Sequence, residues 1–213
     1  IKNPLTPIQL SIDRLKNKYE SSIQSVEKEN FNNYLKTIVK QINQIENLVN
    51  EFSDFARMPK PIFQKNKIIE IVKNNISLLR EVDKDILINF NFKDSELSLK
   101  FDGEQISRVI FNLIKNSIES IHEKSKKNPN FTKIIDIEII DKNDYIAINI
   151  TDNGTGFSTN IIKNITKPYF TTKPKGSGLG LSIVNKIIND HNGSIKFNTN
   201  KKGAKVEVIL PKN

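Results

Sequence analysis

The sequence of 213 residues contains no cysteine, and this absence excludes a large class of chemistry. Disulfide bonds, thiolate catalysis and cysteine-ligated metal centres all require that residue. Histidine is nearly as rare: only His122 and His191 are present, and neither has a third partner at the spacing of a metal site. We therefore interpret neither histidine as a metal ligand, and we expect the chain to belong to a reducing compartment.

Long apolar runs are also missing. No run approaches the roughly 20 residues that a membrane-spanning helix needs, and no signal peptide is visible. The composition, 37% hydrophobic and 27% charged, is that of a soluble globular protein. The net charge of +9 comes from lysines spread along the chain, with no basic block and few aromatics nearby. These features indicate a lysine-rich surface more than a nucleic-acid partner.

Two segments near the N-terminus carry apolar residues at alternating steps of three and four, the spacing of a heptad seam. The seam positions are Leu5, Ile8, Ile12, Leu15 and Tyr19 in the first segment, and Phe31, Leu35, Ile38, Ile42, Ile45, Val49 and Phe52 in the second. Two such helices joined by a short polar loop predict an antiparallel hairpin. Its seams either pair with a second hairpin in a dimeric four-helix bundle or pack on the rest of this chain, and periodicity leaves both open.

Pro59 and Pro61 end the second helix and predict a domain boundary, with residues 1–58 before it and 59–213 after it. Beyond the boundary, helical and strand patterns alternate, which predicts an α+β sandwich with one sheet and helices covering one face. Residues 155–177 are rich in Gly, Pro, Thr and Lys and are predicted to be mostly loop. The predicted helices are 68–79, 104–121 and 180–191, and the predicted strands are 86–92, 97–101, 134–140, 145–151, 194–199 and 204–210.

The helix at 104–121 carries an unusual polar stripe. Asn112, Asn116 and Glu119 are spaced i, i+4 and i+7, so they share one face. Oxygen donors of this kind suit a hard cation such as Mg²⁺, and Lys115 beside them could reach a phosphate. The alternative is a plain solvated stripe. The two asparagines favour the ligand interpretation because they are mediocre helix formers in an otherwise apolar helix.

The sequence DNGTG at 152–156 directly follows a predicted strand. Such a turn is an ordinary hairpin pattern. It is also compatible with a ligand loop, in which Asp152 accepts a hydrogen bond from an exocyclic amine such as that of adenine. Gly154 and Gly156 would then let the backbone approach the ring closely.

Two further motifs lie just before the last predicted helix, and the second of them runs into it. KPYFTTK at 167–173 places an aromatic pair, threonines and lysines within a long loop, which suggests an anchored lid facing an anion. GSGLGL at 176–181 leads into a helix, where backbone N–H groups and the helix dipole favour negative charge. The glycine spacing matches neither the dinucleotide fingerprint nor the P-loop, and a flexible cap is the alternative. Taken together, the four motifs predict a nucleoside triphosphate site.

The same four motifs resemble the conserved boxes of sensor histidine kinases. FNLIKNSIES is similar to the N box, DNGTGF to the G1 box, KPYFTTK to the F box and GSGLGLSIV to the G2 box, in the same order and spacing. Residues 1–57 resemble the dimerisation and phosphotransfer hairpin of these kinases, and FSDFARMPKP resembles the nitrogen-regulation subgroup. The resemblance implies a helical hairpin followed by the ATP-binding fold shared with gyrase-type ATPases.

The resemblance also implies roles for individual residues. Asn116 would ligate Mg²⁺ between the phosphates of ATP, with Asn112 beside it and Lys115 near the phosphates, while Asp152 would bind the adenine amine. Glu119 matches a common family position to which we assign no firm role. The remaining ATP-binding residues implied by the motifs are Gly154, Gly156, Phe170, Thr171, Thr172, Lys173, Gly176, Ser177, Gly178, Leu179 and Gly180.

One departure from the family pattern concerns the phosphoacceptor. The opening IKNPLTP resembles the segment that follows the phosphorylated histidine, but that histidine and the glutamate after it are not in the sequence. We expect a chain cut just inside this motif, able to bind Mg-ATP but unable to autophosphorylate. It retains Asn3, four positions after the expected histidine, which the family links to positioning water for dephosphorylation.

The resemblance further implies a kinase that passes the γ-phosphoryl group of ATP to a histidine and then to a response-regulator aspartate. Its partners would be a second copy, through the hairpin, and a receiver domain. Its location would be the cytoplasmic part of a sensor anchored through segments outside this sequence. The rivals are a gyrase-like or chaperone-like ATPase and a non-catalytic dimerisation module. Gyrase-type enzymes use a glutamate as general base where this chain has Asn112, which cannot accept a proton.

Overall fold

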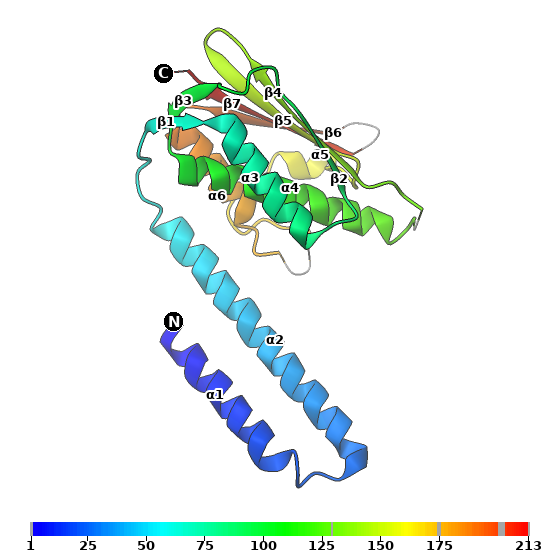
Figure 1. The fold of residues 1–213 in the computed structure, drawn as a ribbon. Helices are drawn as coiled ribbons and strands as arrows, with labels where there is room; N and C mark the ends of the chain where they lie inside the picture. The colour runs from blue at the N-terminus through cyan, green and yellow to red at the C-terminus, as the bar shows by residue number, and fades with distance from the viewer. Residues whose placement is uncertain (1, 129, 174–175, 200–202, 213) are drawn as a thin grey trace. The chain divides into compact units, whose positions relative to one another are not determined.

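A computed structural model describes residues 2–128, 130–173, 176–199 and 203–212. The chain divides into two compact units, residues 1–58 and residues 59–213. Unit 1 is an antiparallel pair of helices, α1 (Lys2–Tyr19) and α2 (Ser25–Ala56) (Figure 1). The predicted helical hairpin is thereby confirmed.

The contact between α1 and α2 uses only part of each predicted seam. Leu5 and Ile12 from α1 pack with Leu35 and Ile42 from α2 in a small buried cluster. The alternate seam positions stay about half exposed, among them Ile8, Leu15, Ile38, Ile45 and Phe52. Within each heptad, one seam residue therefore faces the partner helix, and the other leaves a row of apolar surface along the hairpin.

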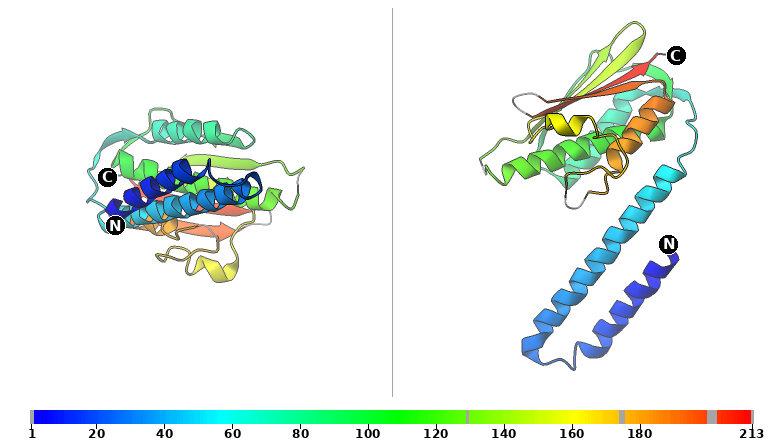
Figure 2. Two further views of the ribbon diagram at one scale, coloured as in Figure 1. Left: turned by 90° about the horizontal axis from the view of Figure 1, so that it is seen from below. Right: turned by 180° about the vertical axis from the view of Figure 1, so that it is seen from behind.

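Unit 2 is built around a five-stranded sheet with helices α3, α4 and α6 on one face, together with a separate two-stranded sheet (Figures 1 and 2). The strand order is β2-β4-β5-β7-β6, with β2 parallel to β4 and the other neighbours antiparallel. The elements are β1 (Gln64–Lys67), α3 (Ile68–Val82), β2 (Leu87–Asn91), β3 (Ser98–Phe101), α4 (Gly103–Ser125), β4 (Ile134–Asp141), β5 (Tyr145–Asp152), α5 (Thr159–Ile162), α6 (Gly180–Asp190), β6 (Ser194–Thr199) and β7 (Ala204–Pro211).

The core lies between this sheet and helices α3, α4 and α6. Ile146, Ile148 and Ile150 of β5 are fully buried because alternate residues of a strand point to the same face. The opposite face carries polar side chains such as Asp136 and Glu138 and is uncovered by any helix in the described part of the chain. The two layers confirm the predicted sandwich.

Two details of the prediction are wrong. The strand predicted at 97–101 does not join the main sheet: β3 pairs antiparallel with β1 in a separate two-stranded sheet. The sequence of β1, QKNK, has no apolar alternation and gave no sign of a strand. The segment 155–177, predicted to be mostly loop, contains the short helix α5.

Candidate nucleotide-binding site

Helix α4 places the polar stripe at the border of its buried face. Asp102 caps the N-terminus, its carboxylate accepting the backbone N–H of Gln105 at 3.0 Å. Two to four turns further on, Asn112 and Asn116 are half-buried, whereas Lys115 is exposed. The amide nitrogen of Asn112 donates to the carbonyl of Arg108 at 2.8 Å. The Asn112 Oδ1 takes no part in that hydrogen bond.

Asp152 ends β5 and is buried, with 5% of its surface exposed. Its carboxylate accepts hydrogen bonds from the Ser117 hydroxyl at 3.0 Å and from the backbone N–H of Gly154 at 2.9 Å. A longer bond comes from the backbone N–H of Ala204 at 3.4 Å. Burial raises the pKa of Asp152, and the hydrogen bonds from Gly154 and Ser117 oppose that rise. A buried acceptor held by fixed donors suits recognition of an amine.

The loop after Asp152 is pressed against α4. A methyl group on Gly154 would lie 2.3 Å from the Ser120 hydroxyl and 2.7 Å from the Ser120 carbonyl carbon, so no larger residue fits. Thr155 continues the contact, because its backbone N–H donates to Ser120 Oγ at 3.0 Å. Gly156 has a φ of +72°, a conformation that favours glycine. Gly154 therefore brings this loop onto the helix that carries the polar stripe, whereas Gly156 packs on the other side, against Thr199 and Gly203.

Sequence reasoning missed three residues of this region. Ser117 and Ser120 hold Asp152 and the loop from α4, and Gly203 packs on the loop from the other side. A methyl group on Gly203 would lie 2.2 Å from the Asp152 carbonyl oxygen. The one available sign was a serine at position 117 within the apolar face of the helix.

The KPYF segment and the GSGLG segment pack on each other through their backbones. Gly178 has a φ of +71°, and a methyl group there would lie 2.6 Å from the Tyr169 carbonyl carbon and 2.9 Å from the Phe170 nitrogen. Phe170 is half-buried and Leu179 is fully buried. The backbone N–H of Leu179 donates to Ser177 Oγ at 3.2 Å. The two motifs form one folded unit at the start of α6.

Lys173 connects this unit to α4. Its ammonium group donates to Asn116 Oδ1 at 3.2 Å and forms an ion pair with the Glu119 carboxylate. Thr171 supports it locally by accepting the backbone N–H of Lys173 at 3.1 Å. Thr172 is exposed. A cation therefore already lies against the carboxamide and carboxylate oxygens of α4, which is the donor chemistry that Mg²⁺ prefers.

The start of α6 lies beside Asn112. Gly180 is its first residue, and a methyl group there would lie 3.4 Å from Asn112 Oδ1. The free N–H groups of an α-helix lie in its first turn and attract anions. The structure thus brings together the N-terminus of α6, the polar stripe of α4 and Lys173, three features that are far apart in the sequence.

Other predicted residues are placed as follows. A methyl group on Gly176 would meet Thr171 Oγ1 at 2.6 Å, so this glycine packs within the loop. Asn3 belongs to α1, but its side chain lies outside the described residues. His122 contacts the Asp83 carboxylate and His191 is buried. In the described ranges, no three histidine, cysteine or acidic side chains cluster as a metal site would require.

Comparison with known proteins identifies the protein family to which this chain is similar. Residues 101–213 match the family of histidine kinase-, DNA gyrase B- and HSP90-like ATPases, and residues 1–61 match the His Kinase A phospho-acceptor domain. The catalytic domain of histidine kinase ThkA superimposes with a TM-score of 0.63 at 27% identity, covering 71% of this chain and 96% of that one. A structure of ThkA in complex with the response regulator protein TrrA has the same fold, with a TM-score of 0.72 at 22% identity over 100% of this chain and 60% of that one.

Curated relatives narrow the class to a subgroup. A putative NtrY-like sensor histidine kinase of Rickettsia felis is 37% identical over 209 residues, covering 98% of this chain and 34% of that protein. The nitrogen regulation protein NtrY of Azorhizobium caulinodans is 36% identical over 203 residues, covering 95% of this chain and 26% of that protein. The chain belongs to the sensor histidine kinases, in the NtrY-like subgroup, and it spans about a third or less of the length of these relatives. None of the helices described is long and apolar enough to cross a membrane.

Proposed function

We propose that residues 59–213 bind Mg-ATP and present its γ-phosphoryl group for transfer to a histidine, from which it passes to an aspartate of a response regulator. The observation that supports the proposal is the close approach of Gly180, at the start of α6, to the side chain of Asn112 on α4. Phosphoryl transfer requires positioning and charge neutralisation more than covalent chemistry, and a helix N-terminus facing an amide stripe supplies both.

Each end of the nucleotide would meet a different set of residues. Asp152 would accept the adenine amine, and the loop at Gly154 and Gly156 would shape the base pocket. The phosphates would lie between the α6 N-terminus and Lys173, in reach of Lys115. Gly176, Ser177, Gly178 and Leu179 would supply backbone to the phosphates. Phe170 would anchor the loop, and Thr171 and Thr172 would contact the phosphates.

Mg²⁺ would be held by Asn116, whose Oδ1 now accepts the Lys173 ammonium. The residues fit this ion because carboxamide and carboxylate oxygens are hard donors, and Mg²⁺ keeps several waters of its own. When bound, the ion would neutralise phosphate charge. Asn112 argues against direct hydrolysis of ATP by a gyrase-like route, because an amide cannot act as a general base.

Neither histidine of this sequence is placed to accept the phosphoryl group. Residues 1–58 contain no histidine. His122 is engaged with Asp83, and His191 is 2% exposed with both ring nitrogens bonded. We infer that this chain binds nucleotide without autophosphorylating. Asn3 would serve dephosphorylation of the receiver domain. The half-exposed row of the hairpin would pair with a second copy.

The test is calorimetric titration of the chain with MgADP, comparing Asp152→Asn with a control. The amide retains an acceptor for Gly154 N–H and can donate to Ser117, but it offers the adenine amine one acceptor fewer. A hydrogen bond to a charged group contributes about 1.5–3 kcal/mol, so affinity should fall at least tenfold. Asp136→Asn, on the opposite face of the sheet, is the matched control and should leave affinity unchanged. Equal affinities in the two variants would refute the site.

A further inference from the structure

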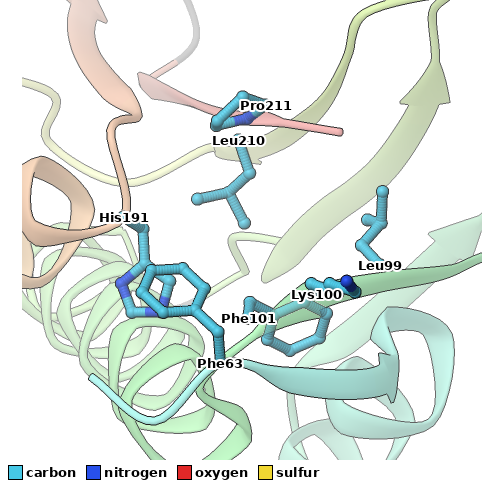
Figure 3. Close-up of a pocket in the computed structure, with 7 residues that line it drawn as sticks. All are labelled: Phe63, Leu99, Lys100, Phe101, His191, Leu210 and Pro211. Carbon is cyan, nitrogen blue, oxygen red and sulfur yellow. The ribbon is translucent and has the colours of Figure 1, made fainter. Parts of the chain in front are cut away.

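The first residues of unit 2, 59–63, have no regular secondary structure, yet two hydrogen bonds and one ring contact attach them to the rest of the unit. The carbonyl of Pro59 accepts the side-chain amide of Gln105 at 3.0 Å. The backbone N–H of Ile62 donates to Asp102 Oδ2 at 2.9 Å. The ring of Phe63 packs against the ring of His191, with the centroids 5.0 Å apart and the ring planes tilted by 50° (Figure 3). We call this segment the connector, because it lies between α2, which ends at Ala56, and β1.

The connector is bonded to the ends of two helices. Asp102 is the N-cap of α4, and His191 is the C-cap of α6. The backbone N–H of Asp102 donates to His191 Nε2 at 3.1 Å, and His191 Nδ1 lies 2.8 Å from the Ile187 carbonyl. Because one nitrogen accepts and the other faces an acceptor, the ring carries a single proton, on Nδ1. His191 thus joins the last turn of α6, the start of α4 and the Phe63 ring.

The first turn of α6 and the middle of α4 line the candidate nucleotide site. Helix α6 packs against α4, and its first residue, Gly180, lies beside Asn112. Helix α6 is only 11 residues long, so a shift at its C-cap would displace its N-terminus as well. Packed helices are bistable rather than continuously deformable, and small movements at one end are therefore transmitted.

We propose that the connector is a docked segment and that His191 is a positioning residue that couples it to the nucleotide site. This inference rests on the proposed function for the nucleotide, but the docking stands on the contacts alone. Coupling is reciprocal: if MgADP favours the docked connector, then docking favours MgADP by the same factor. A change transmitted along α2 into the connector would in this way alter the arrangement of α4 and α6.

A histidine that only fills the core, with its hydrogen bonds made, would give the same buried ring without any coupling. The test must therefore measure both the docking of the connector and the affinity for MgADP. The probe is amide hydrogen exchange at Ile62, followed by NMR on the 213-residue chain with and without MgADP. Allosteric coupling is typically about 5- to 150-fold. We expect Ile62 exchange to be protected without nucleotide and slowed a further fivefold or more by saturating MgADP.

Phe63→Ala is the first variant, because Phe63 is 45% exposed and its loss should not unfold the unit. It should speed Ile62 exchange and weaken MgADP binding, the latter by at most the factor by which MgADP slows Ile62 exchange in the unsubstituted chain. Phe92→Ala, which removes a half-buried ring paired with Phe90, is the control and should change neither. His191→Ala should behave as Phe63→Ala. His191→Gln, whose amide can both donate to Ile187 and accept from Asp102, should restore part of both readouts.

Several results would overturn the proposal. Ile62 exchange at the rate of an unstructured peptide would refute docking. Faster Ile62 exchange in Phe63→Ala with unchanged MgADP affinity would refute the coupling, as would failure of His191→Gln to recover either readout. Absence of MgADP binding by the unsubstituted chain would refute the proposed function and the coupling with it, while Ile62 protection would still decide the docking.

Discussion

Lys173 and Asn116 are 57 positions apart in the sequence, yet the Lys173 ammonium donates to Asn116 Oδ1 at 3.2 Å. The same ammonium is paired with Glu119 one turn further along α4. The contact ties the loop before α6 to the helix that carries the expected magnesium ligand. Mg²⁺ at Asn116 and the Lys173 ammonium at Asn116 would compete for one oxygen, so binding of the ion would free the lysine for the phosphates.

Replacing Lys173 by Met is therefore expected to act more on a triphosphate than on a diphosphate. The variant keeps the length of the side chain but loses the charge-assisted hydrogen bonds that an ammonium makes to phosphate oxygens. We expect a non-hydrolysable ATP analogue to bind about tenfold more weakly and MgADP to be affected less, both measured by calorimetry. Lys163→Met, an exposed lysine of the same loop region, is the control. Equal losses for the two nucleotides would contradict a role at the terminal phosphate.

The space around two glycines predicts opposite results for the same substitution. Gly154→Ala would place a methyl group 2.7 Å from the backbone of Ser120, whereas Gly180→Ala meets only the Asn112 side chain, at 3.4 Å. Overpacking of a close contact costs about 1–3 kcal/mol, while alanine in a helix is favoured over glycine by up to about 1 kcal/mol. Urea unfolding should show Gly154→Ala strongly destabilised and Gly180→Ala unchanged or stabilised. Comparable stabilities would show that the loop is free to move from α4.

Local patterns in the sequence predicted the elements and most motif residues, because periodicity and turn chemistry are short-range properties. The heptad steps predicted α1 and α2, and the alternation at Ile86 and Ile88 predicted β2. What failed depends on distant partners. Strand β1 forms only because Gln64–Lys67 pairs with β3, and nothing in QKNK encodes that. Ser117 belongs to the candidate site only because its hydroxyl contacts the carboxylate of Asp152, which is 35 positions later in the sequence.

The buried carboxyl of Asp152 predicts a conflict between stability and binding. Burial raises its pKa above the ordinary value of 3.8, so the folded state holds the proton more tightly than the unfolded state. The contribution of this group to folding is then fully present below pH 3.8 and is lost as the pH rises through the raised value. Asp152→Asn removes that titration.

We therefore expect Asp152→Asn to be more stable than the original chain near neutral pH, with the gain shrinking as the pH falls toward about 4. The measurement is the urea midpoint at a series of pH values, alongside the calorimetric titration with MgADP. The variant should gain stability and lose nucleotide affinity together. A variant less stable at neutral pH would mean that the bonds to Ser117, Gly154 and Ala204 outweigh the cost of burying the charge.

The apolar row on the hairpin predicts self-association. Ile38, Ile45 and Phe52 are 46%, 47% and 47% exposed, although a heptad seam normally buries both of its positions. Burying a large aliphatic side chain contributes about 1.5–3 kcal/mol, and each such residue would count twice in a symmetric dimer. Ile45→Lys should therefore shift the chain from dimer to monomer in sedimentation velocity.

The control for this experiment is Asn47→Lys, at another exposed position of α2 that lies outside the seam, which adds a positive charge without removing apolar surface. It should sediment as the unsubstituted chain does. If both lysine variants stay dimeric, the dimer is formed by another surface. If the unsubstituted chain is monomeric throughout the concentration range, the alternate seam positions are not a dimer interface in this chain. Nucleotide affinity should be the same in all three proteins, because the site residues lie wholly within residues 59–213 apart from Asn3.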